Sequence, residues 1–81
     1  MKTTDFIGKL YDLGFGVTFG PYDVKIVKSG FFRRKVARVS SIESKEKEIN
    51  YRRLRRMKPD VKEKLLDLIA EYSKTPIEER R

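Results

Sequence analysis

The spacing of apolar residues changes twice along this 81-residue chain, and the changes divide it into three parts. Residues 3–13 and 61–72 repeat apolar side chains at intervals of three and four, which is the spacing of one helix face. Between them, Phe15, Val17 and Phe19 alternate with small or polar residues, which is typical of a strand. A chain of this length is expected to form one domain. The order of helix, sheet and helix predicts an α+β fold.

The first helix is expected at residues 3–13. Thr3 or Thr4 can cap its start, because a hydroxyl accepts hydrogen bonds from the free amides of the first turn. Gly14 follows at a position where a left-handed residue commonly ends a helix.

The second helix is expected to start near Asp60, which forms with Glu63 a D-x-x-E pattern similar to a capping box. Its apolar stripe consists of Val61, Leu65, Leu68, Ile69 and Tyr72. Thr75-Pro76 closes it. Residues 77–81 form a charged tail that we expect to fray, so that residues 1–76 make the compact domain.

The middle of the chain is expected to form two or three antiparallel strands. Residues 15–19 make the first, and a turn at 20–23 and a shorter alternating stretch at 24–27 follow. Residues 33–40 make the next clear strand. Its alternation would place Lys35 and Arg33 on one face with Ala37 and Val39, and would place Arg34, Val36 and Arg38 on the other. Both helices would cover one face of the sheet and leave the opposite face open to solvent.

Residues 46–58 fit a strand, a loop or a helix. We prefer a strand at 46–51, with Ile49 and Tyr51 pointing inward. If residues 50–58 are helical instead, Leu54 and Met57 would continue the apolar stripe of the second helix, and the arginines between them would be exposed. In either case Leu54 and Met57 are expected to anchor this segment to the core, and contact with a partner is the less favoured alternative.

The charge of the chain is concentrated in its middle. Thirteen of the twenty Lys and Arg residues lie between Lys25 and Lys58, together with only three acidic residues, so this stretch carries +10 while the whole chain carries +8. A local concentration of positive charge attracts polyanions. The densest part is residues 52–58, where five of seven residues are basic and none is acidic.

This pattern predicts contacts to the nucleic-acid backbone, because the planar fork of an arginine side chain can grip phosphate oxygens with two donors. The alternative interpretation is a solvated loop whose charge only keeps a small protein soluble. The candidate contact residues are Arg52, Arg53, Arg55, Arg56, Lys58, Arg34 and Arg38, with Phe31 as a stacking candidate. The pattern does not distinguish DNA from RNA.

Catalysis is not expected from this sequence. The chain contains no cysteine and no histidine, which excludes disulfides, thiolate metal sites and imidazole bases. Its glycines match neither G-x-x-x-x-G-K-[ST] nor G-x-G-x-x-G. No catalytic residue, metal or cofactor is therefore predicted. No apolar stretch approaches the roughly 20 residues of a membrane-spanning helix, and the cytoplasm is the expected location.

The C-terminal helix and tail, LLDLIAEYSKTPIEER at residues 65–80, resemble the end of a group of small phage and prophage proteins of Gram-positive bacteria. These proteins carry a "DLI-EYA-TPIEER" ending after a short β region. Residues 36–40 and the pair Leu13-Gly14 also resemble this group, whereas the basic run at 52–58 is not part of the shared pattern. The resemblance implies a phage or prophage accessory protein that acts in the bacterial host cell and is not an enzyme.

Two further partners remain open. A host protein with an acidic surface would suit the same basic residues, as expected for a phage-encoded inhibitor of a host enzyme or defence complex. A homodimer could form through exposed sheet edges, because a small sheet leaves its edge strands unpaired.

Overall fold

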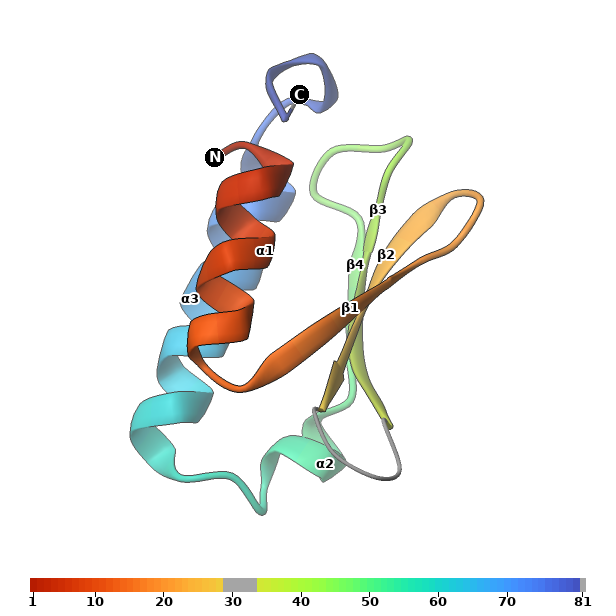
Figure 1. The fold of residues 1–81 in the computed structure, drawn as a ribbon. Coiled ribbons are helices and arrows are strands. Elements are labelled where there is room, and N and C mark those ends of the chain that lie inside the picture. The colour runs from red at the N-terminus through yellow and green to blue at the C-terminus, as the bar shows by residue number, and fades with distance from the viewer. Residues whose placement is uncertain (29–33, 81) are drawn as a thin grey trace.

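The computed structural model describes residues 1–28 and 34–80. In chain order its elements are α1 (Thr3–Asp12), β1 (Phe15–Phe19), β2 (Asp23–Lys28), β3 (Lys35–Ser40), β4 (Lys47–Ile49), α2 (Tyr51–Leu54), α3 (Pro59–Lys74) and the 3-10 helix η1 (Ile77–Glu79). The strands form one antiparallel sheet in the order β1-β2-β3-β4. Helices α1 and α3 lie side by side on one face of this sheet (Figure 1). The predicted α+β class and the shared helix face are confirmed.

The sheet has one strand more than the two or three that we expected. The additional strand is β2, which covers the alternating stretch at 24–27. It pairs with β1 on one side and β3 on the other, so it is an inner strand of the sheet. Its residues Val24 and Ile26 are buried in the core.

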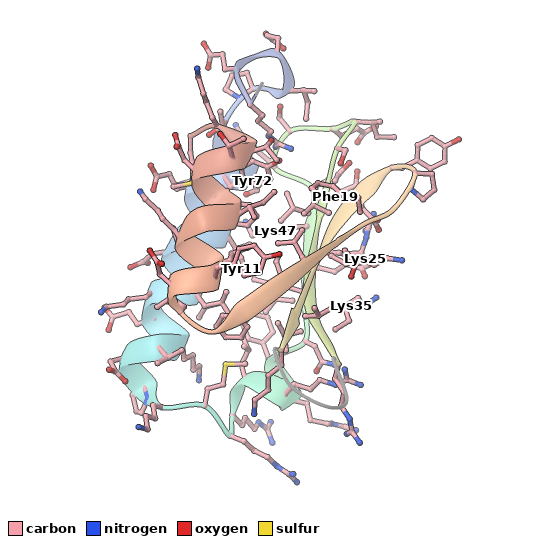
Figure 2. The ribbon with its side chains drawn as sticks, viewed as in Figure 1. Tyr11, Phe19, Lys25, Lys35, Lys47 and Tyr72 are labelled. Atoms are coloured by element: carbon pink, nitrogen blue, oxygen red, sulfur yellow. The ribbon has the colours of Figure 1, made fainter. Side chains whose placement is uncertain are left out.

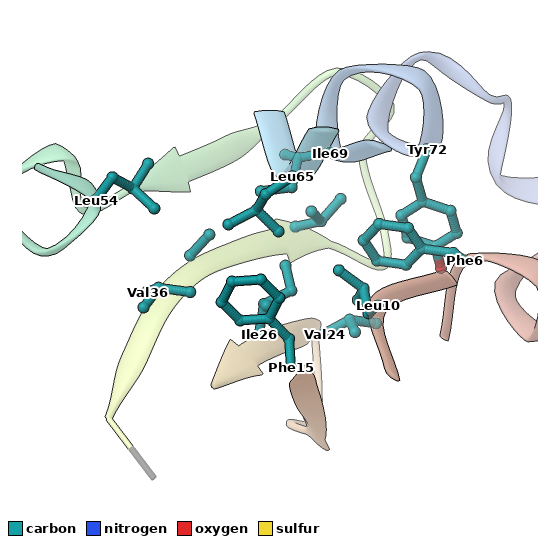
Figure 3. Close-up of a cluster of buried hydrophobic side chains, with 12 residues drawn as sticks. Phe6, Leu10, Phe15, Val24, Ile26, Val36, Leu54, Leu65, Ile69 and Tyr72 are labelled. Atoms are coloured by element: carbon teal, nitrogen blue, oxygen red, sulfur yellow. The ribbon is translucent and has the colours of Figure 1, made fainter. Parts of the chain in front are cut away.

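The core lies between the two helices and the sheet (Figure 3). Helix α1 contributes Phe6 and Leu10, which are both fully buried. The ring of Phe6 stacks on the ring of Tyr72 from α3, with centroids 4.0 Å apart and an interplanar angle of 4°. This stacked pair therefore joins the two helices directly.

The helix starts differ from the expected caps. Lys2 is the N-cap of α1 and makes no side-chain cap hydrogen bond, while the Thr3 hydroxyl lies 2.7 Å from the hydroxyl of Tyr72. Helix α3 begins at Pro59, so Asp60 lies inside the first turn and does not cap it. Proline suits the first position of a helix because the amide it lacks would have no partner there. Gly14 has the expected left-handed conformation, with φ of +92°.

A β-bulge changes the expected faces of β3. The pairing with β2 shifts between Ile26 and Val27, so that Ile26 lies opposite Ala37 and Val27 lies opposite Lys35. Val36 is the extra residue, and both Val36 and Ala37 are buried in the core, at 1% and 3% exposure. The expectation that Val36 lies on the open face and Lys35 on the core face is therefore wrong, because a bulge interrupts the alternation. Figure 2 shows Lys35 on the side of the sheet away from the helices.

Residues 46–58 contain a strand, a helix and a turn. Strand β4 ends at Ile49, which is half-buried as expected. The chain then leaves the sheet, and the Asn50 side chain accepts a hydrogen bond from the amide of Arg53 at 3.2 Å and thereby caps α2. Tyr51 consequently begins α2 and is 60% exposed, so its expected inward position is wrong.

The C-terminal segment packs against the domain. Residues 77–79 form η1, and Arg80 is only 4% exposed. The carbonyl of Arg80 accepts a hydrogen bond from the amide of Thr3 at 2.7 Å, which ties the segment to the start of α1. Residues 77–80 therefore differ from the frayed tail that we expected, because Arg80 finds buried acceptors.

Candidate nucleic-acid interface

Helix α2 and the turn after it present most of the predicted contact residues. Leu54 is fully buried and Met57 is half-buried against the core, which confirms that both anchor the segment. The exposed basic residues around them are Arg52, Arg53, Arg55, Arg56 and Lys58. The buried leucine fixes the helix on the domain, and the short helix spreads the arginines around its solvent side.

The β2–β3 hairpin adds further basic residues at the same end of the molecule (Figure 1). Arg53 connects the two parts, because its Nη1 donates a hydrogen bond to the carbonyl of Lys35 at 2.7 Å. The amide of Asn50 also donates to the carbonyl of Val36 at 2.8 Å. The start of β3 and the start of α2 are thus joined by two hydrogen bonds.

We call the combined surface the basic end. It consists of Lys28, Arg34, Lys35, Arg52, Arg53, Arg55, Arg56 and Lys58, all of which are exposed. The described segments that form it, residues 24–28, 34–37 and 50–58, contain no Asp or Glu. These segments therefore contribute only positive charge, and eight cations are exposed on two adjoining parts of the fold.

Arg38 lies on the open face of the sheet, as predicted, but outside the basic end. Its Nε donates to Asp23 Oδ2 at 2.8 Å, and its Nη1 lies 3.8 Å from Glu48 Oε1. The hydrogen bond to Asp23 raises the pKa of Arg38, with the nearby negative charges adding to the effect. Arg38 therefore stays charged, and two carboxylates offset that charge on the open face.

The open face is accordingly less basic than its sequence implies. Lys25 lies opposite Arg38 in the register of β2 and β3, and Figure 2 shows it pointing away from the helices. Asp23 and Glu48 both lie beside Arg38. Sequence reasoning missed Asp23 as the partner of Arg38, since the residues are fifteen positions apart and only the antiparallel register brings them together.

The remaining predicted residues are Arg34 and Phe31. Arg34 is exposed next to the start of β3, and its carbonyl accepts a hydrogen bond from the amide of Lys28 at 3.0 Å. Phe31 lies outside the described residues. Lys28 and Lys35 belong to the basic end but were not predicted as site residues. Their position in the central basic stretch could have indicated them from the sequence. The outward orientation of Lys35 could not be predicted, because it depends on the bulge in β3.

A shallow groove lies between α1 and α3. It is lined by Lys9, Asp12, Leu13, Lys64, Asp67, Leu68 and Glu71. Across residues 1–28 and 34–80 there is no group of three or more Asp or Glu residues placed to hold a metal ion. None of the described helices is both long enough and apolar enough to cross a membrane.

Comparisons with protein-family models, with curated proteins and with solved structures found no match to this chain.

Proposed function

We propose that this protein binds the backbone of nucleic acid through the basic end and that it acts without catalysing a reaction. The observation that carries the proposal is the anchoring of α2 by Leu54, which presents four arginines in a segment without an acidic residue. Arginines on a backbone that is held in place lose less conformational freedom on binding than arginines in a mobile tail. The role of a phage or prophage accessory protein is part of the same proposal and rests on the resemblance of the C-terminal segment.

The expected mode of binding is independent of base sequence. The basic end offers guanidinium and ammonium donors, which suit phosphate oxygens. Each phosphate that the protein neutralises releases a counterion, so the logarithm of the affinity falls linearly with the logarithm of the salt concentration, with a slope near −0.9 per phosphate on duplex DNA. A steep salt dependence is therefore the first property to measure.

The experiment is fluorescence anisotropy with labelled single-stranded and double-stranded DNA and RNA over a series of salt concentrations. The informative variant is Arg52→Ala with Arg56→Ala, because neither side chain hydrogen-bonds to another of the described residues, whereas Arg53 bonds to the carbonyl of Lys35. We expect weaker binding to all sequences and a salt slope reduced by about two. The matched control is Lys2→Ala with Lys74→Ala, which removes the same charge from the opposite end of the molecule (Figure 1).

The proposal fails if no nucleic acid binds at low salt, or if the control variant weakens binding as much as the arginine variant. An acidic protein surface could bind the same cations, and a different experimental result would indicate this alternative. A partner captured from host lysate that survives nuclease treatment, and that is lost with Arg52→Ala and Arg56→Ala, would indicate a protein target instead.

A further inference from the structure

An exposed tyrosine lies beside the arginines of the basic end. Tyr51 is the first residue of α2 and is 60% exposed. Leu54 packs this short helix on the core, and the cap by Asn50 turns the chain out of the sheet just before Tyr51. Among the described residues, no side chain hydrogen-bonds to the Tyr51 hydroxyl and no aromatic ring stacks on its ring. The structure therefore holds this residue on an anchored helix and leaves most of its side chain open to solvent.

The surroundings of Tyr51 distinguish it from the other exposed tyrosines. Single exposed apolar side chains are common on protein surfaces, so exposure alone indicates no site. Tyr11 and Tyr22 are exposed to a similar extent, but each is followed directly by an aspartate. Tyr51 is followed by two arginines, and residues 50–58 contain five cations and no acid. Of these three tyrosines, Tyr51 alone combines an open ring with a surface that attracts polyanions.

Helical geometry places an arginine beside this ring. Residues 51–54 form α2, and Arg55 keeps the helical backbone, with φ of −56° and ψ of −29°. At about 100° of rotation per residue, Arg55 lies about 40° from Tyr51 around the helix axis and one turn further along. Arg53 lies about 160° from Tyr51 by the same spacing, and its guanidinium bonds to the carbonyl of Lys35. Tyr51 and Arg55 therefore share one side of α2, away from the side that joins β3.

We propose, on the basis of the nucleic-acid binding proposed above, that the ligand is single-stranded nucleic acid and that Tyr51 stacks on one of its bases. Every base has a flat π-face, so this contact requires no particular base. Arg55 then holds the phosphate next to the stacked base, and the other cations of the basic end follow the strand. Tyr51 is thus a binding residue that adds attraction to a base, which phosphate contacts alone do not supply.

A duplex offers Tyr51 no such contact. Its bases are paired and stacked on one another, and unstacking them costs free energy. Contact in the grooves requires a helix or a β-ribbon that can enter them. Helix α2 has only four residues and is packed on the core through Leu54, and α3 carries Asp60 in its first turn, which would repel phosphates. A duplex therefore reaches only the cations of α2, whereas a single strand reaches the cations and the ring.

The test is fluorescence anisotropy with three DNA probes of equal length in the same buffer. They are a single strand of mixed sequence, the duplex of that strand, and a strand of abasic sugars, which keeps the phosphates and lacks every base. DNA serves as the probe, because neither stacking nor phosphate contact requires the 2′-hydroxyl. We expect the single strand to bind more tightly than the duplex and about fivefold or more tightly than the abasic strand, because one stacked base contributes at least that factor.

Tyr51→Ala should weaken binding to the single strand by about fivefold or more and leave binding to the duplex and the abasic strand unchanged. Alanine is a good helix former, so α2 should keep its arginines in place, and circular dichroism with urea denaturation checks this. Tyr51→Phe keeps the ring and should bind like the unchanged protein. The matched control is Tyr22→Ala, which removes a tyrosine of similar exposure, 64%, from the β1–β2 turn at the other end of the sheet (Figure 1).

A photo-cross-link locates the contact on the protein. A single strand that carries 5-iodouracil reacts on illumination with aromatic side chains that stack on this base. Peptide mapping should then place the adduct at Tyr51 and not at Tyr11 or Tyr22.

The inference is overturned if the duplex binds more tightly than the single strand, if Tyr51→Ala binds the single strand normally, or if Tyr22→Ala weakens binding as much. It is also overturned if Tyr51→Ala weakens binding to the abasic strand as much as to the single strand. In each of these cases, arginine-dependent binding to the abasic strand and the duplex would leave the proposed function intact. Absence of binding to all three probes would overturn the proposed function as well.

Discussion

The guanidinium carbon of Arg80 lies 4.6 Å from the centre of the Tyr72 ring, and that ring also stacks on Phe6. The C-terminal segment, α3 and α1 therefore meet at one aromatic side chain. The donors of Arg80 reach the carbonyls of Ser40, Ser73 and Thr75 at 2.7, 3.0 and 2.9 Å. Arg80 thus connects the end of β3 to the end of α3 and, through the Tyr72 ring, to Phe6 of α1.

Replacement of this side chain should destabilise the whole domain. Arg80→Ala removes the side-chain donors of the Ser40 and Thr75 carbonyls, whereas the Ser73 carbonyl still accepts from the amide of Lys45. Each carbonyl left without a donor costs about 1–3 kcal/mol, so we expect the free energy of unfolding to fall by about 3 kcal/mol in urea denaturation. Arg80→Lys keeps the charge but has no planar fork, so its free energy of unfolding should lie between those of the unchanged protein and Arg80→Ala. Glu79→Ala, at an exposed neighbouring residue, is the control. Equal midpoints for Arg80→Ala and the control would show that the contacts of Arg80 do not stabilise the fold.

The hydroxyls of Thr3 and Tyr72 should couple energetically, because they lie 2.7 Å apart and join α1 to α3. Thr3→Val and Tyr72→Phe each remove one hydroxyl and preserve most of the shape. A double-mutant cycle by urea denaturation should give a coupling of about 0.5–1.5 kcal/mol, the usual net value of one hydrogen bond. Additive effects of the two substitutions would contradict the pairing.

The stability of the fold should require glycine at position 20, because the Asp23 side chain occupies the space that a larger residue would need. A Cβ at position 20 would collide with the Asp23 carboxylate oxygen Oδ1, and Arg38 holds the other oxygen of that carboxylate. We expect Gly20→Ala to lower the free energy of unfolding by about 1–3 kcal/mol, as overpacking does. In an Asp23→Ala background the same change should be neutral or stabilise by up to about 1 kcal/mol, since alanine restricts the unfolded chain more than glycine does. The same loss in both backgrounds would assign the cost to the backbone instead.

Leu54 should affect both stability and binding. Its side chain is fully buried, and Leu→Ala in a core costs about 2–5 kcal/mol. Because Leu54 anchors α2, Leu54→Ala should also weaken nucleic-acid binding under conditions where circular dichroism shows the variant to be folded. Met57→Ala, at a half-buried neighbour, should have a smaller effect on both quantities. Normal binding by folded Leu54→Ala would mean that the arginines do not need a fixed helix.

Much of the secondary structure was predictable, because it depends on residues close in sequence. The apolar intervals of three and four in residues 3–13 and 61–72 correspond to α1 and α3, and Gly14 ends α1 with positive φ. The expectation failed where a local pattern was interrupted. Val36 lies in the core because of the bulge in β3, and Tyr51 belongs to α2 and not to the sheet because Asn50 caps that helix.

The candidate site was predictable only in part. The arginines of α2 and of the turn after it are exposed around a buried Leu54, which is the arrangement that a helical segment at 50–58 implied. The charge balance of Arg38 was not predictable, because it depends on Asp23 in another strand. The addition of Lys35 to the basic end depends on the bulge and on the hydrogen bond from Arg53.

By itself, the sequence determined the order of helix, strands and helix, the end of α1, and the concentration of positive charge between Lys25 and Lys58. These properties follow from side-chain spacing and composition within a few residues. Only the tertiary structure decided which cations share a surface and that the positive charge of the open face is partly neutralised. It also decided that Arg80 is buried and donates to the carbonyl of Ser40, forty positions earlier in the chain. Such contacts join residues far apart in the chain, and local periodicity does not constrain the register or the bulge that brings them together.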